Sequence, residues 1–395
     1  MTEEENVFPL VAKTMSGLEE VLSAELTDLG AGNIEILKRA VKFTGNLKVL
    51  YNVNYRCRTA LRILMPIASF RIYKEDDFYH RISKIKWEEY LSVDQTFAVD
   101  ATVNNSVFSH SQFVALRCKD AIVDRFRARM GQRPSVELKQ PNLRIDIHLS
   151  HNECSVSLDS SGDSLHKRGY HIRLSEAPIS EVLAAGMIAL SGWDKKTDFM
   201  DFMCGSGTIP IEATMIASNI PAGYYRDSYG FMKWKNFDKT LWDEVKQEAD
   251  SLICEMEGSV YASDNSEEAI SIAAINIKNA KLHHDIQLEQ KEMSEQKPRD
   301  GKCFIICNPP YGERIKPENI VELYKSIGDT FKQNFAGCQA WIISSAPEAL
   351  KFVGLKPSRK LVLFNGPLEC RFVKFEMYEG SKKAKYDPNY KKPAL

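Results

Sequence analysis

The chain lacks the features that mark membrane, secreted and zinc-binding proteins. No apolar run among its 395 residues approaches the ~18 residues of a membrane span. Its first six residues, MTEEEN, have neither the basic nor the apolar region of a signal peptide. The nine cysteines form no Cys-x-x-Cys pair, the eight histidines show no metal-ligand spacing, and Cys303 and Cys307 are expected to be core thiols. The sequence therefore predicts a reduced, cytoplasmic protein with no membrane segment and no metal site.

Charge is balanced over the whole chain but uneven along it. The net charge is −1 at pH 7, so no overall basic excess indicates a nucleic-acid partner. Between residues 117 and 144, however, eight Lys or Arg stand against three Asp or Glu. Residues 115–130 predict an amphipathic helix whose inward positions are Cys118, Ile122, Phe126 and Met130. Its basic face is either a phosphate contact or a solvated helix surface. The candidate contacts are Arg117, Arg125, Arg127 and Arg129.

The tetrapeptide Asn308-Pro309-Pro310-Tyr311 is the strongest functional signal. It follows the apolar run 303–307, which predicts a buried strand of a parallel sheet. Ligands of open α/β sheets bind beyond the carboxyl ends of such strands. The Asn308 side-chain oxygen and the Pro309 carbonyl can accept hydrogen bonds from an exocyclic amine, and the Tyr311 ring can stack on a base. Because proline restricts its own φ and the preceding residue, these acceptors are preset. The pattern predicts a site for a planar base, with an ordinary proline-rich turn as the alternative.

A glycine turn between a predicted strand and a predicted helix indicates a cofactor site. Residues 197–204 have the pattern of a strand, Gly205-Ser206-Gly207-Thr208 forms the turn, and residues 209–217 have the pattern of a helix. The third glycine of a dinucleotide fingerprint is missing, and so is the Lys-Ser/Thr of a phosphate loop. Asp201 at the strand end would repel phosphate and attract a sulfonium or ammonium group. This combination favours S-adenosylmethionine, and a glycine turn without a ligand is the alternative.

A second carboxylate ends the next predicted strand, residues 259–264. Asp264 there is placed to bind ribose hydroxyls, or alternatively to cap the helix that follows. The separation from the glycine turn is much larger than the ~20 residues of the simple nucleotide fold. Residues 220–257 are therefore predicted to be an insertion. Most of its aromatic side chains are expected in a packed core, with stacking on RNA as the alternative: Tyr224, Tyr225, Tyr229, Phe231, Trp234, Phe237 and Trp242.

The order of predicted elements indicates an α/β fold with a separate amino-terminal part. From about residue 177 helices and strands alternate, as in a doubly wound parallel sheet, and residues 360–364 and 370–378 predict a terminal antiparallel hairpin. The preceding part has an α+β pattern in two small units. Its expected elements are strands at 7–12, 34–37, 40–43, 60–67 and 97–102, a helix at 17–29, and a hairpin at 144–149 and 154–158.

Five segments carry a resemblance to a known family. They are Ser164–Tyr170, Ala177–Ile179, Asp201–Thr208, Asn308–Arg314 and Asn365–Cys370. In these segments the chain resembles RNA methyltransferases that join a ferredoxin-like and THUMP module to a class I (Rossmann-like) methyltransferase domain. Within that group it is most similar to the bacterial guanine-N2 methyltransferases of 23S ribosomal RNA. The resemblance implies a ferredoxin-like domain at 1–68, a THUMP domain at 69–162, a catalytic domain at 163–380 and a basic tail at 381–395.

The resemblance also implies a role for each matching residue. Asn308, Pro309, Pro310 and Tyr311 would hold the target base. S-adenosylmethionine would be bound by Pro178, Ile179, Asp201, Cys204, Gly205, Ser206, Gly207, Thr208, Asp264, Glu292 and Asn308. RNA would be contacted by Arg117, Arg125, Arg127, Arg129, Lys167 and Arg168. The chain departs from the family pattern at Phe202, where proline is usual, at Glu292, where aspartate is usual, and at His171, where arginine is common.

The expected activity is methylation of the exocyclic N2 amine of a guanosine in 23S ribosomal RNA, on the free RNA or a precursor particle. Three alternatives stay open at this point. A guanine-N2 methyltransferase of tRNA would share every motif. An adenine-N6 methyltransferase would offer another exocyclic amine to the same acceptors. A non-catalytic RNA-binding factor could keep the fold, although it would not need an intact cofactor loop. The sequence leaves the oligomeric state undecided.

Overall fold

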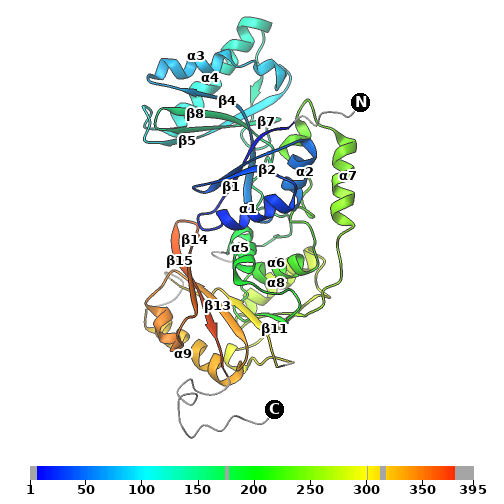
Figure 1. Ribbon diagram of the computed structural model, residues 1–395, viewed down its shortest axis with the longest axis vertical. Coiled ribbons are helices and arrows are strands. Elements are labelled where there is room, and N and C mark those ends of the chain that lie inside the picture. The colour runs from blue at the N-terminus through cyan, green and yellow to red at the C-terminus, as the bar shows by residue number, and fades with distance from the viewer. Residues whose placement is uncertain (1–6, 174–177, 300, 312–316, 379–395) are drawn as a thin grey trace. The chain divides into compact units, whose positions relative to one another are not determined.

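The computed structural model describes residues 7–173, 178–299, 301–311 and 317–378, which form two compact units (Figure 1). Unit 1 contains the chain up to Met15, Glu19–Arg168 and Pro221–Ser251. Unit 2 contains Ser16–Leu18, Gly169–Ile220 and the chain from Leu252 onward. Of the helices that the structure describes, none combines the length and apolar character needed to cross a membrane.

Unit 1 is built on one eight-stranded sheet in the order β2-β3-β1-β4-β8-β7-β5-β6. Helices α1 and α2 pack on the first half of this sheet, α4 packs on β5 in the second half, and α3 packs beside α4. The strands are β1 (Phe8–Thr14), β2 (Gly32–Leu37), β3 (Ala40–Gly45), β4 (Ala60–Arg71), β5 (Thr96–Asn104), β6 (Ser135–Val136), β7 (Leu143–Ser150) and β8 (Glu153–Asp159). The helices are α1 (Glu19–Asp28), α2 (Leu47–Arg56), α3 (Glu75–Lys84), η1 (Trp87–Glu89), α4 (Ser111–Met130), η2 (Gly230–Lys233) and α7 (Lys239–Asp250).

The two small units expected from the sequence share this sheet through one long strand. Strand β4 pairs with β1 on one side and with β8 on the other, so the hydrogen-bonded ladder is continuous. The pairing with β8 shifts register between Pro66 and Ala68, where the proline has no N–H to donate. This continuity could not be predicted from the sequence, because a proline inside an apolar run indicates the end of a strand as readily as a bulge.

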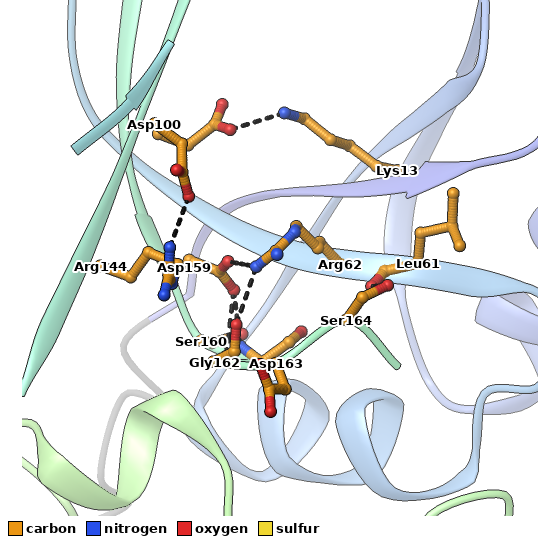
Figure 2. A network of polar contacts seen from close by, with 12 residues as sticks. Lys13, Leu61, Arg62, Asp100, Arg144, Asp159, Ser160, Gly162, Asp163 and Ser164 are labelled. Atoms are coloured by element: carbon orange, nitrogen blue, oxygen red, sulfur yellow. Dashed lines mark hydrogen bonds and ion pairs between the residues drawn. The ribbon is translucent and has the colours of Figure 1, made fainter. Parts of the chain in front are cut away.

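Ion pairs cross the middle of the sheet in unit 1 (Figure 2). Arg62 on β4 contacts the buried Asp159 carboxylate of β8 and donates to the Gly162 carbonyl at 2.8 Å. Burial raises the pKa of Asp159, and the Arg62 charge opposes that effect. Lys13 of β1 lies 2.7 Å from Asp146 of β7. Strands that are far apart in the sequence are therefore joined by paired charges as well as by the backbone ladder.

Most of the insertion predicted at 220–257 belongs to unit 1 and not to unit 2. Residues 221–251 belong to unit 1, and α7 packs beside α2. The Trp242 ring contacts Tyr51 and Tyr55 edge-on, and Phe231 stacks on Tyr51 with centroids 4.5 Å apart. The expectation of a packed core is therefore confirmed for the buried rings of the segment: Tyr229, Phe231, Trp234 and Trp242.

Two local features of unit 1 differ from expectation. Helix α2 was not predicted, although Asn46 caps it by accepting a hydrogen bond from the Val49 amide at 3.0 Å. Helix α4 has the expected buried residues Cys118, Ile122 and Phe126, but Met130 is 47% exposed. Met130 is the last residue of the helix, and Gly131 then takes a left-handed conformation that ends it.

Unit 2 has the expected doubly wound fold with a terminal hairpin. Its seven strands lie in the order β11-β10-β9-β12-β13-β15-β14. The first five are parallel, and β15 is antiparallel to both β13 and β14. The strands are β9 (Phe199–Asp201), β10 (Val260–Asp264), β11 (Ile286–Gln290), β12 (Phe304–Cys307), β13 (Gln339–Ser344), β14 (Arg359–Asn365) and β15 (Leu368–Glu376). The helices are α5 (Glu181–Ser191), α6 (Thr208–Ala217), α8 (Glu267–Asn279), η3 (Met293–Glu295), α9 (Pro317–Asn334) and η5 (Ala349–Val353).

Both faces of the sheet in unit 2 are covered. Alternate strand residues such as Ile305 and Ile342 join Phe331 of α9 in one core cluster. The residues between them, such as Ile306 and Ile343, are fully buried as well, and α6 and α8 pack on the strands. Burial on both faces explains the continuous apolar strands seen in the sequence. It also leaves the carboxyl ends of the strands as the natural place for a polar site.

Candidate active site

The glycine turn after β9 shapes the edge of a cavity. Gly205 and Gly207 have φ of +53° and +82°, a region that side chains with a Cβ rarely occupy. At Gly207 a Cβ would lie 3.4 Å from the Ala273 Cβ, which is an ordinary contact, so the positive φ and not the packing of α8 favours glycine there. The Gly205 amide donates to the Asp264 Oδ2 at 3.0 Å, and Asp264 Oδ1 accepts from the Ser266 amide at 3.1 Å. Asp264 thus holds the glycine turn and the Ser266 amide at the same time, while Ser266 itself caps α8 by accepting a hydrogen bond from the Ala269 amide at 3.2 Å.

The cavity lies at the carboxyl ends of the parallel strands and has a volume of about 460 Å³. Of the eleven residues predicted to bind cofactor, all but Asp201 and Gly207 line it. Its lining also includes Pro310, which was predicted as a base contact, and eight residues that sequence reasoning had not assigned to the site: Phe202, Met203, Ile209, Asn265, Met293, Ser294, Leu323 and Ser326. Asn265 and Met293 directly follow predicted residues, so adjacency could have found them. Leu323 and Ser326 come from α9, which no motif had connected to the site.

The residues that line the cavity have the chemistry that S-adenosylmethionine requires. Polar side chains in the lining include Asp264, Asn265 and Glu292, and Asn265 Nδ2 donates to Glu292 Oε1 at 3.3 Å. Carboxylates and an amide there suit ribose hydroxyls and an adenine amine. Apolar side chains such as Ile179 and Met293 line the same cavity and can pack against an aromatic base.

Asp201 ends β9, as the sequence predicted, but it does not line the cavity. The side chain is 1% exposed and absent from the cavity lining, and its Oδ1 accepts a hydrogen bond from the Met203 amide at 3.2 Å. Burial raises the pKa of Asp201 well above its usual range. Its other oxygen, Oδ2, is buried and has no hydrogen-bond partner among the described residues, so the structure shows no direct contact between Asp201 and the cavity. Asp201 instead holds the backbone that leads into the glycine turn.

Asn308 is the one residue of the tetrapeptide with an orphaned acceptor. Its Oδ1 is buried and has no hydrogen-bond partner among the residues that the structure describes, and Asn308 lines the cavity. A buried amide oxygen without a hydrogen-bond partner lowers the stability of the fold by about 1–3 kcal/mol. A ligand N–H that donates to this oxygen would restore that free energy. Tyr311 differs from the expectation of a stacking ring. It is 3% exposed, and its hydroxyl accepts from Asn365 Nδ2 at 2.9 Å. Gly312–Arg314 of the motif lie outside the described residues.

The cysteines near the site are not nucleophiles. Cys307 is fully buried, as the sequence predicted, and burial raises the pKa of its thiol well above the usual range. Burial, followed by the neighbouring carboxylates Asp201 and Asp264, has the same effect on Cys204. Both remain neutral thiols near pH 7, so chemistry that needs a cysteine nucleophile, such as methylation at cytosine C5, is not supported.

The four arginines of α4 that were predicted to contact RNA differ in how far their side chains are exposed and in what they bind. Arg125 is bound through two hydrogen bonds of 2.8 and 2.6 Å to Glu88, and this interaction lowers the pKa of Glu88 to about 2. Arg127 and Arg129 have 56% and 59% of their side chains exposed, although each pairs with an acid. Arg117 lies over the Tyr79 ring at 4.7 Å. All four arginines lie on α4, but the main role of Arg125 is structural, because its side chain forms an ion pair with Glu88.

Arg168 requires a correction, whereas Lys167 does not. Arg168 is 1% exposed and donates to the carbonyl oxygens of Leu165, at 2.7 Å, and Arg58, at 2.5 Å. A guanidinium used in this way cannot lie on a phosphate-binding surface. Lys167 is 60% exposed and lies 3.6 Å from Asp163. The basic pair in the sequence thus consists of one surface residue and one buried residue.

Comparison with known proteins assigns each region to a described domain. Residues 9–64 match the RlmL ferredoxin-like domain, residues 73–159 match the THUMP domain, and residues 168–374 match the RMKL-like methyltransferase domain. A Synechocystis protein named as an RNA methyltransferase is 37% identical over 376 residues, which are 94% of this chain and 97% of that protein.

Two further relatives extend the comparison. The ribosomal RNA large subunit methyltransferase K/L of Syntrophotalea carbinolica is 36% identical over 385 residues, which are 93% of this chain. The match covers 53% of that relative, so this chain spans about half of its length. A crystal structure named as a methyltransferase complexed with SAH has 29% identity and a TM-score of 0.86, over 95% of this chain and 99% of that one. The chain therefore belongs to the family of THUMP-containing, RMKL-like RNA methyltransferases.

Proposed function

We propose that the protein transfers a methyl group from S-adenosylmethionine to the exocyclic N2 amine of a guanosine in 23S ribosomal RNA, in the cytoplasm. The observation that carries this proposal is the orphaned Oδ1 of Asn308 at the cofactor cavity. An acceptor held without a partner, next to a cavity that fits the cofactor, is suited to a substrate N–H donor. The relative named as a large-subunit ribosomal RNA methyltransferase supports the choice of RNA.

The chain's own residues act by positioning. When bound, S-adenosylmethionine supplies an electrophilic methyl group on a positively charged sulfur. The Asn308 Oδ1 and the Pro309 carbonyl can accept both protons of an aromatic amine. These hydrogen bonds draw the nitrogen lone pair out of conjugation with the ring and aim it at the methyl carbon. The acceleration then comes mainly from orientation and fixed dipoles.

No strong base is needed before the attack. The amine loses its proton only after the new N–C bond has formed, when the nitrogen is acidic. The neutral thiols of Cys204 and Cys307 agree with this order, since neither can take up a proton as a thiolate would. The target base must also be unpaired or extruded from its stack, because a base-paired amine cannot approach both acceptors.

RNA binding is assigned to unit 1. The exposed Arg127 and Arg129 of α4, with Arg117 beside them, are the candidate phosphate contacts, and Lys167 is a further one. Contacts of this kind fix the register of the RNA without reading its sequence. The choice of base is then left to the cavity and to Asn308.

One incubation tests the proposal. The protein is mixed with labelled S-adenosylmethionine and unmodified total RNA, after which the RNA is separated by size, digested and analysed for methylated nucleosides. N2-methylguanosine in the large ribosomal RNA is the expected product. Label on tRNA would redirect the substrate to that class, and label on adenine would overturn the choice of base while retaining the amine chemistry. No transfer to any RNA would refute the proposal.

A further inference from the structure

Two thiols face each other at the amino ends of β12 and β13, away from the site described above. The Sγ atoms of Cys303 and Cys338 are 3.2 Å apart. Each cysteine directly precedes its strand, and the strands pair in parallel with Phe304 opposite Gln339. The Gln339 amide also reaches the Cys303 carbonyl at 3.4 Å, so the two residues are neighbours across the ladder.

The backbone spacing suits a covalent bond between these sulfurs. Neighbouring strands lie about 4.8 Å apart, and disulfides join Cα atoms separated by roughly 4.4–6.8 Å. Closing the S–S distance from 3.2 Å to about 2.05 Å requires a movement of about 1 Å, which rotation about the Cα–Cβ bonds can supply. No unfolding of the sheet is needed.

The two thiols are chemically unequal. The Cys303 thiol and the Cys303 amide both donate hydrogen bonds to Cys338 Sγ, at 3.2 and 3.3 Å. These donors lower the pKa of Cys338 below that of an ordinary thiol, while the same contact and burial raise the pKa of Cys303. Cys338 is therefore the nucleophile of the pair and Cys303 its resolving partner.

The residue directly before each of the two cysteines is exposed to solvent. Both cysteines are buried, at 3% and 2% exposure, but Gly301 and Lys302 before the first and Gly337 before the second are exposed. A Cβ at Gly337 would meet no atom within 4 Å, so space is open there. The residues that directly precede both cysteines therefore lie at the solvent-exposed edge of the sheet.

We propose that Cys303 and Cys338 form a peroxide-sensitive disulfide site, independent of the methyl-transfer reaction. The Cys338 thiolate attacks one oxygen of hydrogen peroxide, which breaks the O–O bond, gives a sulfenic acid and releases water after protonation. The Cys303 sulfur then attacks the Cys338 sulfur and loses its proton, the S–S bond forms, and a second water leaves. Two thiols are oxidised by two electrons and one peroxide is reduced to two waters. A dithiol reductant reverses the reaction by thiol–disulfide exchange.

The experiment uses the full reduced chain. It is treated with hydrogen peroxide at pH 7, blocked with an alkylating reagent, digested without reduction and mapped by mass spectrometry. We expect one linked peptide pair containing Cys303 and Cys338, lighter than the sum of its parts by two hydrogens and lost after reduction. Cys118 and Cys154, both buried, serve as internal references and should be oxidised at least about tenfold more slowly.

Matched single variants test the assigned roles, with circular dichroism confirming that each variant is folded. Cys303→Ser should leave a sulfenic acid on Cys338 that dimedone traps. Cys338→Ser should leave Cys303 unlabelled under the same conditions. Reversed labelling would overturn the order of attack. A Cys303 and Cys338 pair that stays fully alkylatable while the exposed Cys254 is oxidised would overturn the site itself.

Discussion

The Gly205 amide and the Asp264 carboxylate are joined by a hydrogen bond of 3.0 Å. This bond connects the glycine turn after β9 to the end of β10, and both residues line the cofactor cavity. One side chain thereby determines the conformation of the turn and supplies a polar group to the cavity. Its removal should affect the cofactor before it affects the fold.

Asp264→Ala should therefore weaken S-adenosylmethionine binding by about 10- to 100-fold, since a hydrogen bond to a charged group is worth roughly 1.5–3 kcal/mol. Asp264→Asn should reduce the affinity for S-adenosylmethionine less, because its amide oxygen can still accept a hydrogen bond from the Gly205 amide. Isothermal titration measures both. Glu289→Ala is a matched control, as Glu289 lies on the neighbouring strand and pairs with Arg299 at 3.0 Å. Equal binding by the wild type and Asp264→Ala would remove Asp264 from the site.

Asn308→Ala should abolish turnover while cofactor affinity stays within a few-fold. The substitution removes the acceptor proposed for the amine and leaves most of the cavity lining intact. Single-turnover methylation and a cofactor titration on the same sample separate the two effects. Folding should be kept or slightly improved, because the deleted oxygen has no partner among the described residues. Methylation at the wild-type rate would contradict the assigned role.

Acid should weaken the fold through His171. Its ring lies 3.2 Å from Thr208 Oγ1, and burial lowers its pKa to about 4. An unfolded histidine titrates near 6.5, so the unfolded state takes up the proton first as pH falls. The free energy of unfolding should drop by about 2–3 kcal/mol between pH 7 and pH 4.5 from this group alone. Above about pH 7.5, where the histidine is neutral in both states, the group has no effect. Urea unfolding measures the free energy at each pH, and for His171→Asn this free energy should fall by about 2–3 kcal/mol less between pH 7 and pH 4.5 than for the wild type. If both proteins show the same pH dependence, the sensitive group is not His171.

Charge reversal at Arg127 and Arg129 should weaken RNA binding uniformly across sequences. Each lost phosphate contact should reduce the slope of log affinity against log salt by about 1. Filter binding over a range of salt concentrations gives both quantities. Lys332→Glu on α9 provides a reversal of the same kind outside the proposed surface. If the two arginine variants behave like this control, α4 does not contact RNA.

The catalytic region should not fold when expressed as residues 163–395. That fragment contains the segment 221–251 without the helix α2 against which Trp242 and Phe231 pack. The exposed aromatic surface should cause aggregation. Replacing 221–251 by a short polar linker in the same fragment should restore solubility, measured by size-exclusion chromatography. A soluble, monomeric fragment with the segment intact would show that the segment does not need unit 1.

The sequence predicted most of unit 2 because its signals are local. Each signal depends only on residues that are close together in the sequence. Examples are the apolar strands, the glycines at 205 and 207, and the tetrapeptide that begins at 308. Long-range partners could not be found this way. The aromatics of 221–251 indicated burial but not that their neighbours are Tyr51 and Tyr55. Similarly, nothing near Arg168 distinguishes a guanidinium that binds carbonyls from one that binds phosphate.

The return of residues 221–251 to unit 1 also sets an order of assembly during synthesis. A chain emerging from the ribosome has all strands of the first sheet by residue 159, yet part of that unit's core, including Trp242 and Val245, has not been made. Strand β9 and helix α6 of the second sheet are synthesised in the interval. The amino-terminal unit can therefore complete its core only after translation has passed residue 251, so the two units must mature together rather than one after the other.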